Sequence, residues 1–277
     1  MCDICGCGET QGHDHSSHAR SAAHGHGTGA RRFSFAPEAT GLPGFEPTRI
    51  VELSARLLDR NDAYAAAVAA RLAKAGTFTV NLLSSPGAGK TTLLVETLKR
   101  IAGCWSAAVI EGDQHTDLDA TRIAATGVPA VQLNTGRGCH LDAHMILHAL
   151  DALPDVRCLL IENVGNLICP AGFRLGETKR IVLLSVTEGE DKPLKYPDAF
   201  AGADLMLLTK IDLLPYVDFD VARCLDHARR IKPGLEALHV STRTGEGLRA
   251  WLDWLAAGIA AAPRACGRGA SGGQGRD

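Results

Sequence analysis

The sequence predicts an α/β protein with a doubly wound, mostly parallel sheet of about seven strands. Short apolar runs recur along the chain, and they are continuous rather than alternating, as in strands that are covered on both faces. Helical patterns separate the runs, which is typical of parallel sheets whose crossovers are helices. Most of the chemically distinctive motifs directly follow a run, and ligands of such sheets bind at the carboxyl ends of the strands.

The elements begin with an alanine-rich helical stretch at 47–75, and the apolar runs follow it. Because the runs are apolar on both sides of the pleat, helices are expected to cover both faces of the sheet. The predicted strands are Thr77–Leu83, Ala107–Ile110, Ala130–Gln132, Cys158–Ile161, Ile181–Val186, Leu205–Thr209 and Leu238–Val240.

Three zones separate by composition. Residues 1–45 are rich in Gly, His, Ser and Ala and cannot bury enough apolar surface to offset their ordering entropy, so this segment is expected to be disordered. Residues 46–262 are expected to form the nucleotide-binding domain with its N-terminal helix. The glycine-rich stretch 263–277 is expected to be a flexible tail.

Bulk composition excludes several classes of protein. The chain has 277 residues, is 45% hydrophobic and 22% charged, and carries a formal net charge of −2, so no basic field suggests a nucleic-acid partner. No apolar run approaches the ~18 residues of a membrane span. Cysteines and histidines stand where a signal peptide would be apolar, so a cytoplasmic location is expected. There the nine cysteines are expected to be thiols or metal ligands rather than disulfides.

A glycine-rich turn follows the first predicted strand. Residues 84–91 read SSPGAGKT, which matches the phosphate-loop pattern G-x-x-x-x-G-K-[ST] except that Ser84 replaces the first glycine. In such a loop, backbone N–H groups and the start of the following helix bind phosphates. Lys90 is expected to reach the β- and γ-phosphates, and the Thr91 hydroxyl to bind magnesium. The predicted nucleotide-binding residues here are Gly87, Ala88, Gly89, Lys90, Thr91 and Thr92.

Two further strands end in acidic residues. Asp113 lies in the segment EGDQ, where a carboxylate can hold magnesium through water or orient the attacking water. Glu162 begins the segment ENVG, which has the shape of a D-x-x-G switch, and the Gly165 N–H is a candidate sensor of the γ-phosphate. Acidic residues also end strands as helix caps, so these signals depend on the phosphate loop. The predicted catalytic residues are Lys90, Asp113, Glu162 and Gly165, and the predicted magnesium ligands are Thr91, Asp113 and Glu162.

The sixth predicted strand is followed by the sequence TKID, which matches the guanine-reading pattern N-K-x-D with Thr209 in place of Asn. Asp212 can accept hydrogen bonds from the guanine N1–H and amino group, which adenine does not offer in that arrangement. The stem of Lys210 can pack over the base. Ser241 and Thr242 follow the last predicted strand, where a further base-contacting loop is expected. The predicted cofactors of this site are GTP and Mg²⁺.

The N-terminus offers two candidate metal segments. Cys2, Cys5 and Cys7 can wrap one ion, and three sulfurs with a terminal amine suit square-planar Ni²⁺, whereas Zn²⁺ would take the thiolates tetrahedrally. The alternative is a redox-active or incidental thiol cluster. A histidine tract follows, which favours auxiliary metal storage, the alternative being a tract without function. Its members are His13, His15, His18, His24 and His26.

A third candidate metal site lies inside the predicted domain. Cys139 and His140 follow a predicted strand and are expected to open a helix, where the thiol pKa would be lowered and thiolate favoured. Cys169 lies four residues after Gly165, so it would move with the switch and couple nucleotide state to metal geometry. His144 and His148 follow at helical spacing and are expected to be solvated helix positions.

Taken together, these motifs resemble the HypB family of hydrogenase nickel-incorporation proteins. The resemblance spans the chain except for the histidine tract, the linker after it and the tail. It is carried by the N-terminal C-x-x-C-G-C, NLLSSPGAGKTT at 81–92, EGDQ at 111–114, GCHLD at 138–142, ENVGNL at 162–167 and TEGEDKPLKYP at 187–197.

The resemblance implies a GTP-hydrolysing nickel metallochaperone of the SIMIBI class that forms a nucleotide- or metal-dependent homodimer. It implies a high-affinity nickel site at Cys2, Cys5 and Cys7, and a zinc or nickel site at Cys139, His140 and Cys169 near the dimer interface. It also implies a HypA-type nickel chaperone as partner and the precursor of the [NiFe] hydrogenase large subunit as client.

Two other functions remain open at this point. A urease-type nickel-insertion GTPase shares the phosphate loop, but it usually carries a Cys-Pro-His metal motif where this chain has adjacent Cys139 and His140. A passive nickel or zinc storage protein would need the nucleotide-binding domain only as a scaffold. Intact Lys90, Thr91, Asp113 and Asp212 favour a working nucleotide site over a storage protein.

Overall fold

The computed structural model describes residues 47–113, 118–136 and 138–263, with side chains described from residue 56 onward. The chain from Leu58 onward is one compact unit, and it is this unit that is described below. The predicted metal segment 1–45, with its cysteines and histidine tract, and the tail after Pro263 lie outside the described residues. The domain boundaries therefore stay a prediction.

A seven-stranded sheet forms the centre of the unit, and all of its strands are parallel. The strand order is β3-β2-β4-β1-β5-β6-β7, which confirms the predicted doubly wound α/β fold. The strands are β1 (Phe78–Ser84), β2 (Ala107–Asp113), β3 (Ala130–Asn134), β4 (Cys158–Glu162), β5 (Lys179–Ser185), β6 (Leu205–Thr209) and β7 (Glu236–Val240).

Strand β2 is longer than the sequence predicted, and its additional residues belong to the predicted site. The apolar run ended at Ile110, but β2 continues through Glu111 to Asp113 because these residues still pair with β3. Glu111 also lies opposite Glu162 of β4 in the sheet register. The strand therefore carries acidic side chains into a buried part of the sheet, which an apolar criterion cannot detect.

Helices connect the strands along both faces of the sheet. They are α1 (Pro47–Ala75), α2 (Lys90–Ile101), α3 (Leu118–Ala124), α4 (Ala143–Ala149), α5 (Lys192–Lys195), α6 (Pro197–Ala201), α7 (Val221–Ile231) and α8 (Leu248–Ala261), with 3₁₀ turns at Leu150–Ala152, Cys169–Gly172 and Ile211–Tyr216. No helix among the described residues combines the length and apolar character that a membrane span requires.

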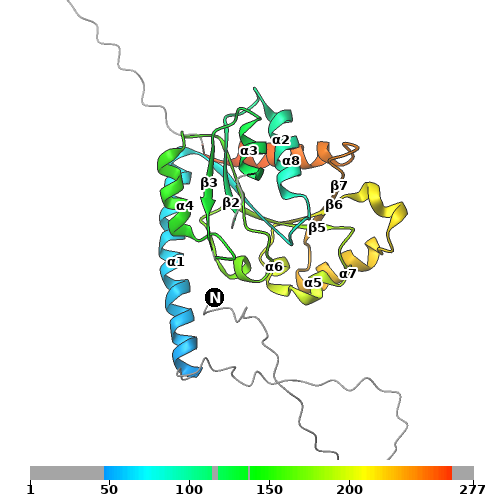
Figure 1. Cartoon of the computed structure of the whole chain (residues 1–277), viewed down its shortest axis with the longest axis horizontal. Coiled ribbons are helices and arrows are strands. Elements are labelled where there is room, and N and C mark those ends of the chain that lie inside the picture. Colours follow the sequence, from blue (N-terminus) through cyan, green and yellow to red (C-terminus); the bar gives the residue numbers. More distant parts are fainter. Residues whose placement is uncertain (1–46, 114–117, 137, 264–277) are drawn as a thin grey trace, which may run out of the picture. The chain divides into compact units, whose positions relative to one another are not determined.

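Alternate residues of the central strands point to opposite faces of the sheet and pack in separate hydrophobic cores. Val80 and Leu82 of β1 pack on one face with α2, α3 and α8, whereas Leu83 points to the other face. That second face holds one cluster under α6 and α7 and another under α4 and the part of α1 around Val68. Figure 1 shows α2, α3 and α8 above the sheet and α5, α6 and α7 below it. The sheet is thus covered on both sides, as continuous apolar strands require.

The start of α4 is tied to α1 by a buried amide. The Asn61 side chain accepts a hydrogen bond from the Ala143 N–H at 2.9 Å and donates one to the Arg174 carbonyl at 2.8 Å. Asp142 caps α4 by accepting from the Met145 N–H. These bonds hold the chain just after Cys139 and His140, at the edge of the sheet where β3 ends.

Candidate functional site

The phosphate loop joins β1 to α2. Gly87 and Gly89 have φ values of +75° and +99°, a backbone conformation that residues with a Cβ rarely adopt. Gly89 is the N-cap of α2, so the free N–H groups of the first helical turn face the loop. The Lys90 ammonium donates to Ser84 Oγ at 2.9 Å, and both side chains are buried. Ser84, which replaces the usual first glycine, is therefore a hydrogen-bond partner of the lysine that is predicted to bind phosphate.

An acidic cluster lies beside this loop. The Thr91 hydroxyl donates to Glu162 Oε1 at 2.7 Å. Among the described residues, Glu162 Oε2 and Glu111 Oε2 are buried without a hydrogen-bond partner. Carboxylate and hydroxyl oxygens are the ligands that Mg²⁺ prefers. The unpartnered Glu162 oxygen, on the carboxylate that contacts Thr91, therefore fits a divalent cation, which these residues would hold.

Burial shifts the ionisation of the charged residues in this cluster. It raises the pKa of Glu111 to about 8, helped by the negative charges of Glu162 and Asp113. Burial also raises the pKa of Glu162 to about 7, against the opposing effects of the Lys90 charge and the Thr91 hydrogen bond. The pKa of Lys90 is lowered by the same burial. A bound cation would relieve the repulsion between the two glutamates.

A dependence of stability on pH follows from Glu111. Its pKa is raised in the folded chain, so between about pH 4.5 and 8 the folded state holds a proton that the unfolded state has lost. The free energy of unfolding then falls as pH rises through this window, by on the order of a few kcal/mol without Mg²⁺. Urea unfolding from pH 5 to 8.5 should show this loss in the wild type and a flatter profile in Glu111→Gln. The exposed control Glu246→Gln should keep the wild-type slope, and equal slopes in all three proteins would contradict the prediction.

The ENVG segment touches the phosphate loop directly. A Cβ on Gly165 would lie 3.0 Å from Pro86 Cα, so a larger residue would press on the phosphate loop. Asn166, the next residue, forms an isolated antiparallel bridge with Ser84. The backbone that follows β4 is therefore packed against the loop predicted to bind phosphate.

The TKID segment holds the phosphate loop from the other side. The Thr209 hydroxyl donates to the Ala88 carbonyl at 2.7 Å, and the Lys210 ammonium donates to the Gly87 carbonyl at 2.7 Å. Asp212 Oδ1 accepts from the buried Ser241 hydroxyl at 2.6 Å. Thr209, the departure from the usual Asn, thus has a defined contact with the loop. Beside it lies a cavity of about 130 Å³ lined by Ala88, Gly89, Thr92, Leu93, Thr209, Lys210, Val240 and Thr242.

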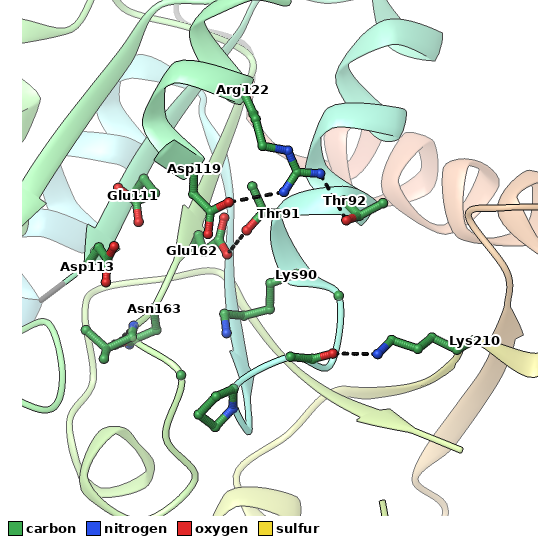
Figure 2. A pocket seen from close by; sticks show the side chains of 16 residues that line it. Lys90, Thr91, Thr92, Glu111, Asp113, Asp119, Arg122, Glu162, Asn163 and Lys210 are labelled. Atoms are coloured by element: carbon green, nitrogen blue, oxygen red, sulfur yellow. Dashed lines mark hydrogen bonds and ion pairs between the residues drawn. The ribbon is translucent and has the colours of Figure 1, made fainter. Parts of the chain in front are cut away.

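One larger cavity, of about 510 Å³, gathers most of the predicted site residues. Its lining includes Gly87, Gly89, Lys90, Thr91, Thr92, Asp113, Glu162, Gly165 and Lys210 (Figure 2). Ala88 and Thr242 line the adjacent smaller cavity, and Ser241 and Asp212 contact each other next to it.

The large cavity also contains side chains that sequence reasoning gave no role. Arg122 of α3 donates to Thr92 Oγ1 and to Asp119 Oδ1, both at 3.1 Å, and so brings a positive charge to the phosphate loop (Figure 2). Glu111, Asp119 and Asn163 are other polar side chains of the cavity that the sequence analysis missed. Glu111 was detectable, because it stands two residues before Asp113 and therefore shares its strand face.

The three residues of the candidate metal site inside the domain lie close together in the structure. One ligand atom from each of Cys139, His140 and Cys169 lies within 4.8 Å of the others, and all three residues are half-buried. Cys139 Sγ is 3.6 Å from His140 Nδ1. Burial lowers the pKa of His140, which favours the neutral imidazole that binds metals. The ring of His140 packs on Phe173 with centroids 4.0 Å apart, which limits its rotation.

The expectation that Cys139 and His140 open a helix is wrong. Helix α4 begins at Ala143 with Asp142 as its N-cap, so the pair lies in the loop before the helix. Asp142, a strong N-capping residue three positions after Cys139, sets this boundary. Helix-terminal stabilisation of a Cys139 thiolate therefore no longer follows from position.

Asn163 connects the nucleotide cavity to this loop. Its Oδ1 accepts from the Leu141 N–H at 3.1 Å and from the Val164 N–H at 3.0 Å. Asn166 adds a second link by donating to the Cys139 carbonyl at 3.5 Å. The segment that carries Glu162 is thus hydrogen-bonded to the segment that carries two of the three candidate metal ligands.

A phosphate loop after a central parallel strand, an acidic cluster beside it and a lysine clamp across it define a P-loop nucleotide-binding protein. The family model of the CobW/HypB/UreG nucleotide-binding domain matches residues 78–239, more than half of the chain. The chain is 50% identical to the hydrogenase maturation factor HypB of Azotobacter vinelandii, over 92% of this chain and 91% of that protein. The chain therefore belongs to the HypB family of hydrogenase maturation factors.

Two solved structures support this assignment. HypB from Archaeoglobus fulgidus matches with a TM-score of 0.69 and 39% identity, over 73% of this chain and 99% of that one. HypB from Helicobacter pylori, solved in complex with nickel, matches with the same TM-score and identity, over 73% of this chain and 95% of that one. Both similarities are well above the level at which only the fold would be shared.

Proposed function

We propose that the protein is a GTP-hydrolysing nickel metallochaperone that inserts nickel during the maturation of [NiFe] hydrogenase. The observation that carries the proposal is the hydrogen-bonded connection, through Asn163, between a phosphate-loop cavity and the Cys139–His140–Cys169 cluster. A protein that delivers a metal must change its affinity for the metal on demand. A nucleotide site joined to thiolate and imidazole ligands offers such control.

Each group in the cavity has a role in this proposal. Lys90 and the N–H groups at the start of α2 bind the phosphates, and Asp113 orients the attacking water. Thr91, Glu162 and Asp113 would hold Mg²⁺, which would neutralise charge on the phosphates when bound. Gly165 senses the γ-phosphate through its N–H. Arg122 adds a positive charge at the edge of the same cavity.

Guanine is the proposed base because of Asp212. Its Oδ1 is oriented by the Ser241 hydroxyl, and Lys210 is held against the phosphate loop, where its stem can cover the base.

We expect Asp212→Asn to weaken GTP binding by at least about tenfold, because a donor amide replaces one acceptor oxygen. The variant should gain affinity for xanthosine triphosphate, because the C2 carbonyl of xanthine can accept a hydrogen bond from the new amide. Competition binding of GTP, ATP and xanthosine triphosphate measures this. The exposed control Asp218→Asn should behave like wild type, and equal wild-type affinities for GTP and ATP would rule out the assignment.

Cys2, Cys5 and Cys7 are proposed to bind one Ni²⁺ ion tightly and independently of nucleotide. They lie within six residues of one another, at a distance in sequence from the phosphate loop and the switch. In equilibrium dialysis the triple alanine variant should lose one tight nickel equivalent, whereas the single-cysteine control Cys266→Ala in the tail should keep it. Unchanged stoichiometry in the triple variant would contradict this role. The tract His13–His26 is proposed as auxiliary storage.

The remaining parts of the proposal concern partners. We propose that the protein works in the cytoplasm as a nucleotide- or metal-dependent homodimer with a HypA-type nickel chaperone. Its client would be the precursor of the hydrogenase large subunit, and the Cys139 cluster would hold Zn²⁺ or Ni²⁺. The membership of the chain in the family of hydrogenase maturation factors supports a role in hydrogenase maturation.

The test loads the full chain with Ni²⁺ and follows phosphate release and nickel transfer to a chromogenic chelator. With GTP present, we expect phosphate release and a nickel transfer rate that differs from that with GDP, whereas ATP should support neither. Phosphate release without any change in the rate of nickel transfer would favour a GTPase that does not deliver nickel. Nickel binding without any phosphate release would favour the storage protein. A urease-type role remains an alternative, and activation of hydrogenase or urease precursor by the loaded chain separates the two.

A further inference from the structure

We propose that Arg180 is a positioning residue for the Cys139 cluster, because its guanidinium holds the turn that carries Cys169. The inference rests on the metal role proposed above for this cluster. Arg180 lies near the start of β5, and its side chain is buried. It donates to the Ala171 carbonyl at 2.8 Å and to the Phe173 carbonyl at 2.7 Å. Both carbonyls belong to the chain that follows Cys169, so one side chain fixes where the turn lies.

The guanidinium is itself fixed by a buried carboxylate. Arg180 Nε donates to Glu177 Oε1 at 2.8 Å, and the two side chains are only 7% and 6% exposed. Glu177 Oε2 accepts from the Leu175 N–H at 2.6 Å. A buried ion pair is stable only when further hydrogen bonds satisfy its charged groups, and the loop backbone supplies them here. The loop between Cys169 and β5 is thus held together by this ion pair.

Phe173 extends the influence of Arg180 to a second candidate ligand. The Phe173 ring packs on the His140 imidazole with centroids 4.0 Å apart, while the Phe173 carbonyl accepts from Arg180. Loss of the guanidinium would therefore release both the turn with Cys169 and the ring that supports His140. Arginine suits this role because its planar fork donates to two carbonyls and a carboxylate at once, whereas a lysine ammonium is a point charge on a flexible stem.

The anchor lies on one side of Cys169. The two carbonyls that Arg180 holds follow the thiol in the chain, whereas Gly165, which lies against Pro86 of the phosphate loop, precedes it. A displacement at Gly165 can therefore still reach Cys169, and Arg180 sets the position from which the thiol moves. Because Glu177 compensates the charge of Arg180, the influence on a bound metal is one of geometry, as with other groups that orient metal ligands from outside the ligand set.

The experiment uses the full chain with Cys2, Cys5 and Cys7 replaced by alanine, and Co²⁺ as the probe. Co²⁺ takes the same thiolate and imidazole ligands as Zn²⁺, and its sulfur-to-metal charge-transfer absorbance rises with the number of bound thiolates, so sites made of histidine alone do not contribute. Cys169→Ala in this parent chain gives the reference without the third ligand. We expect Arg180→Lys to weaken Co²⁺ binding by roughly 10–100-fold and to lower the absorbance toward that reference, with unchanged far-UV circular dichroism.

Two further variants separate positioning from stability. Arg180→Met combined with Glu177→Gln leaves no charge buried alone, and it should lose at least as much absorbance as Arg180→Lys. Arg157→Lys is the matched control, because the Arg157 guanidinium also donates to backbone carbonyls, those of Ile259 at 2.7 Å and Pro263 at 3.1 Å, at the end of α8. It should keep the absorbance and Co²⁺ affinity of the parent chain even if its melting temperature falls.

The outcomes distinguish this inference from the function on which it rests. Parent-like absorbance and affinity in either Arg180 variant would overturn the inference and leave the ion pair as a contact that only stabilises the fold. An equal loss in Arg157→Lys would overturn it too, because the effect would then be one of general stability. If the parent chain shows no more charge transfer than its Cys169→Ala variant, the metal role of the cluster fails, and the inference fails with it.

Discussion

Lys90→Ala should lower the turnover of GTP at saturating concentration by about 10²–10³-fold, or roughly 3–4 kcal/mol of transition-state stabilisation. The ammonium is buried in the cavity and held 2.9 Å from Ser84 Oγ at the end of β1. From there it can follow the charge that develops on the β- and γ-phosphates. A pre-positioned charge in a buried site is effective because it needs no reorganisation during the reaction.

The same lysine also offsets the negative charge of Glu162. Its removal changes the charge of a buried cluster, so turnover must be measured on protein shown by circular dichroism to be folded. Lys99→Ala serves as the matched control, because Lys99 lies on the same helix in an exposed ion pair with Glu96. Control turnover should equal that of wild type. Undiminished phosphate release in Lys90→Ala would show that the hydrolysis, if any, occurs elsewhere.

Motifs that lie within one short segment could be recognised in the sequence. Contacts between segments that are distant in sequence could not be predicted. The phosphate loop, TKID and ENVG each follow a strand, so their place at one edge of the sheet could be predicted. Glu111 and Glu162 face each other only because β2 and β4 are neighbours in the strand order. An apolar pattern does not give that order.

Arg122 and Asn163 illustrate two other reasons for a missed role. Arg122 has Asp119 three residues before it on α3, which in sequence resembles an ordinary solvated ion pair. Asn163 occupies a variable position of the D-x-x-G pattern, which assigns it no role, but its side chain accepts a hydrogen bond from the Leu141 N–H. The cluster of Cys139, His140 and Cys169 was predicted from the positions of these residues after two predicted strands and from the family resemblance, and its closeness in space now has geometric support.

The affinity of that cluster for metal should depend on the bound nucleotide. Ala143 is tied to Asn61 of α1, outside the segment that carries Gly165, so the loop with Cys139 and His140 has an anchor at its end. Cys169 instead begins a short 3₁₀ turn after the segment in which Gly165 touches Pro86. Contact of Gly165 with a γ-phosphate, or its loss, should therefore move Cys169 relative to the other two ligands.

A metal that bridges an anchored segment and a moving one must gain or lose a ligand when the second segment shifts. Because each ~1.4 kcal/mol is tenfold in affinity, loss of one thiolate should weaken binding by at least about tenfold. The measurement compares Ni²⁺ and Zn²⁺ affinity with GDP and with a non-hydrolysable GTP analogue, in a chain whose Cys2, Cys5 and Cys7 are alanine. Cys169→Ala should abolish the difference, and the exposed control Cys104→Ala should retain it. Reciprocity requires the metal to change nucleotide affinity by the same factor. Equal metal affinities in the two nucleotide states, or wild-type binding by Cys169→Ala, would exclude the coupling and leave Cys169 as a packing residue beside Pro170.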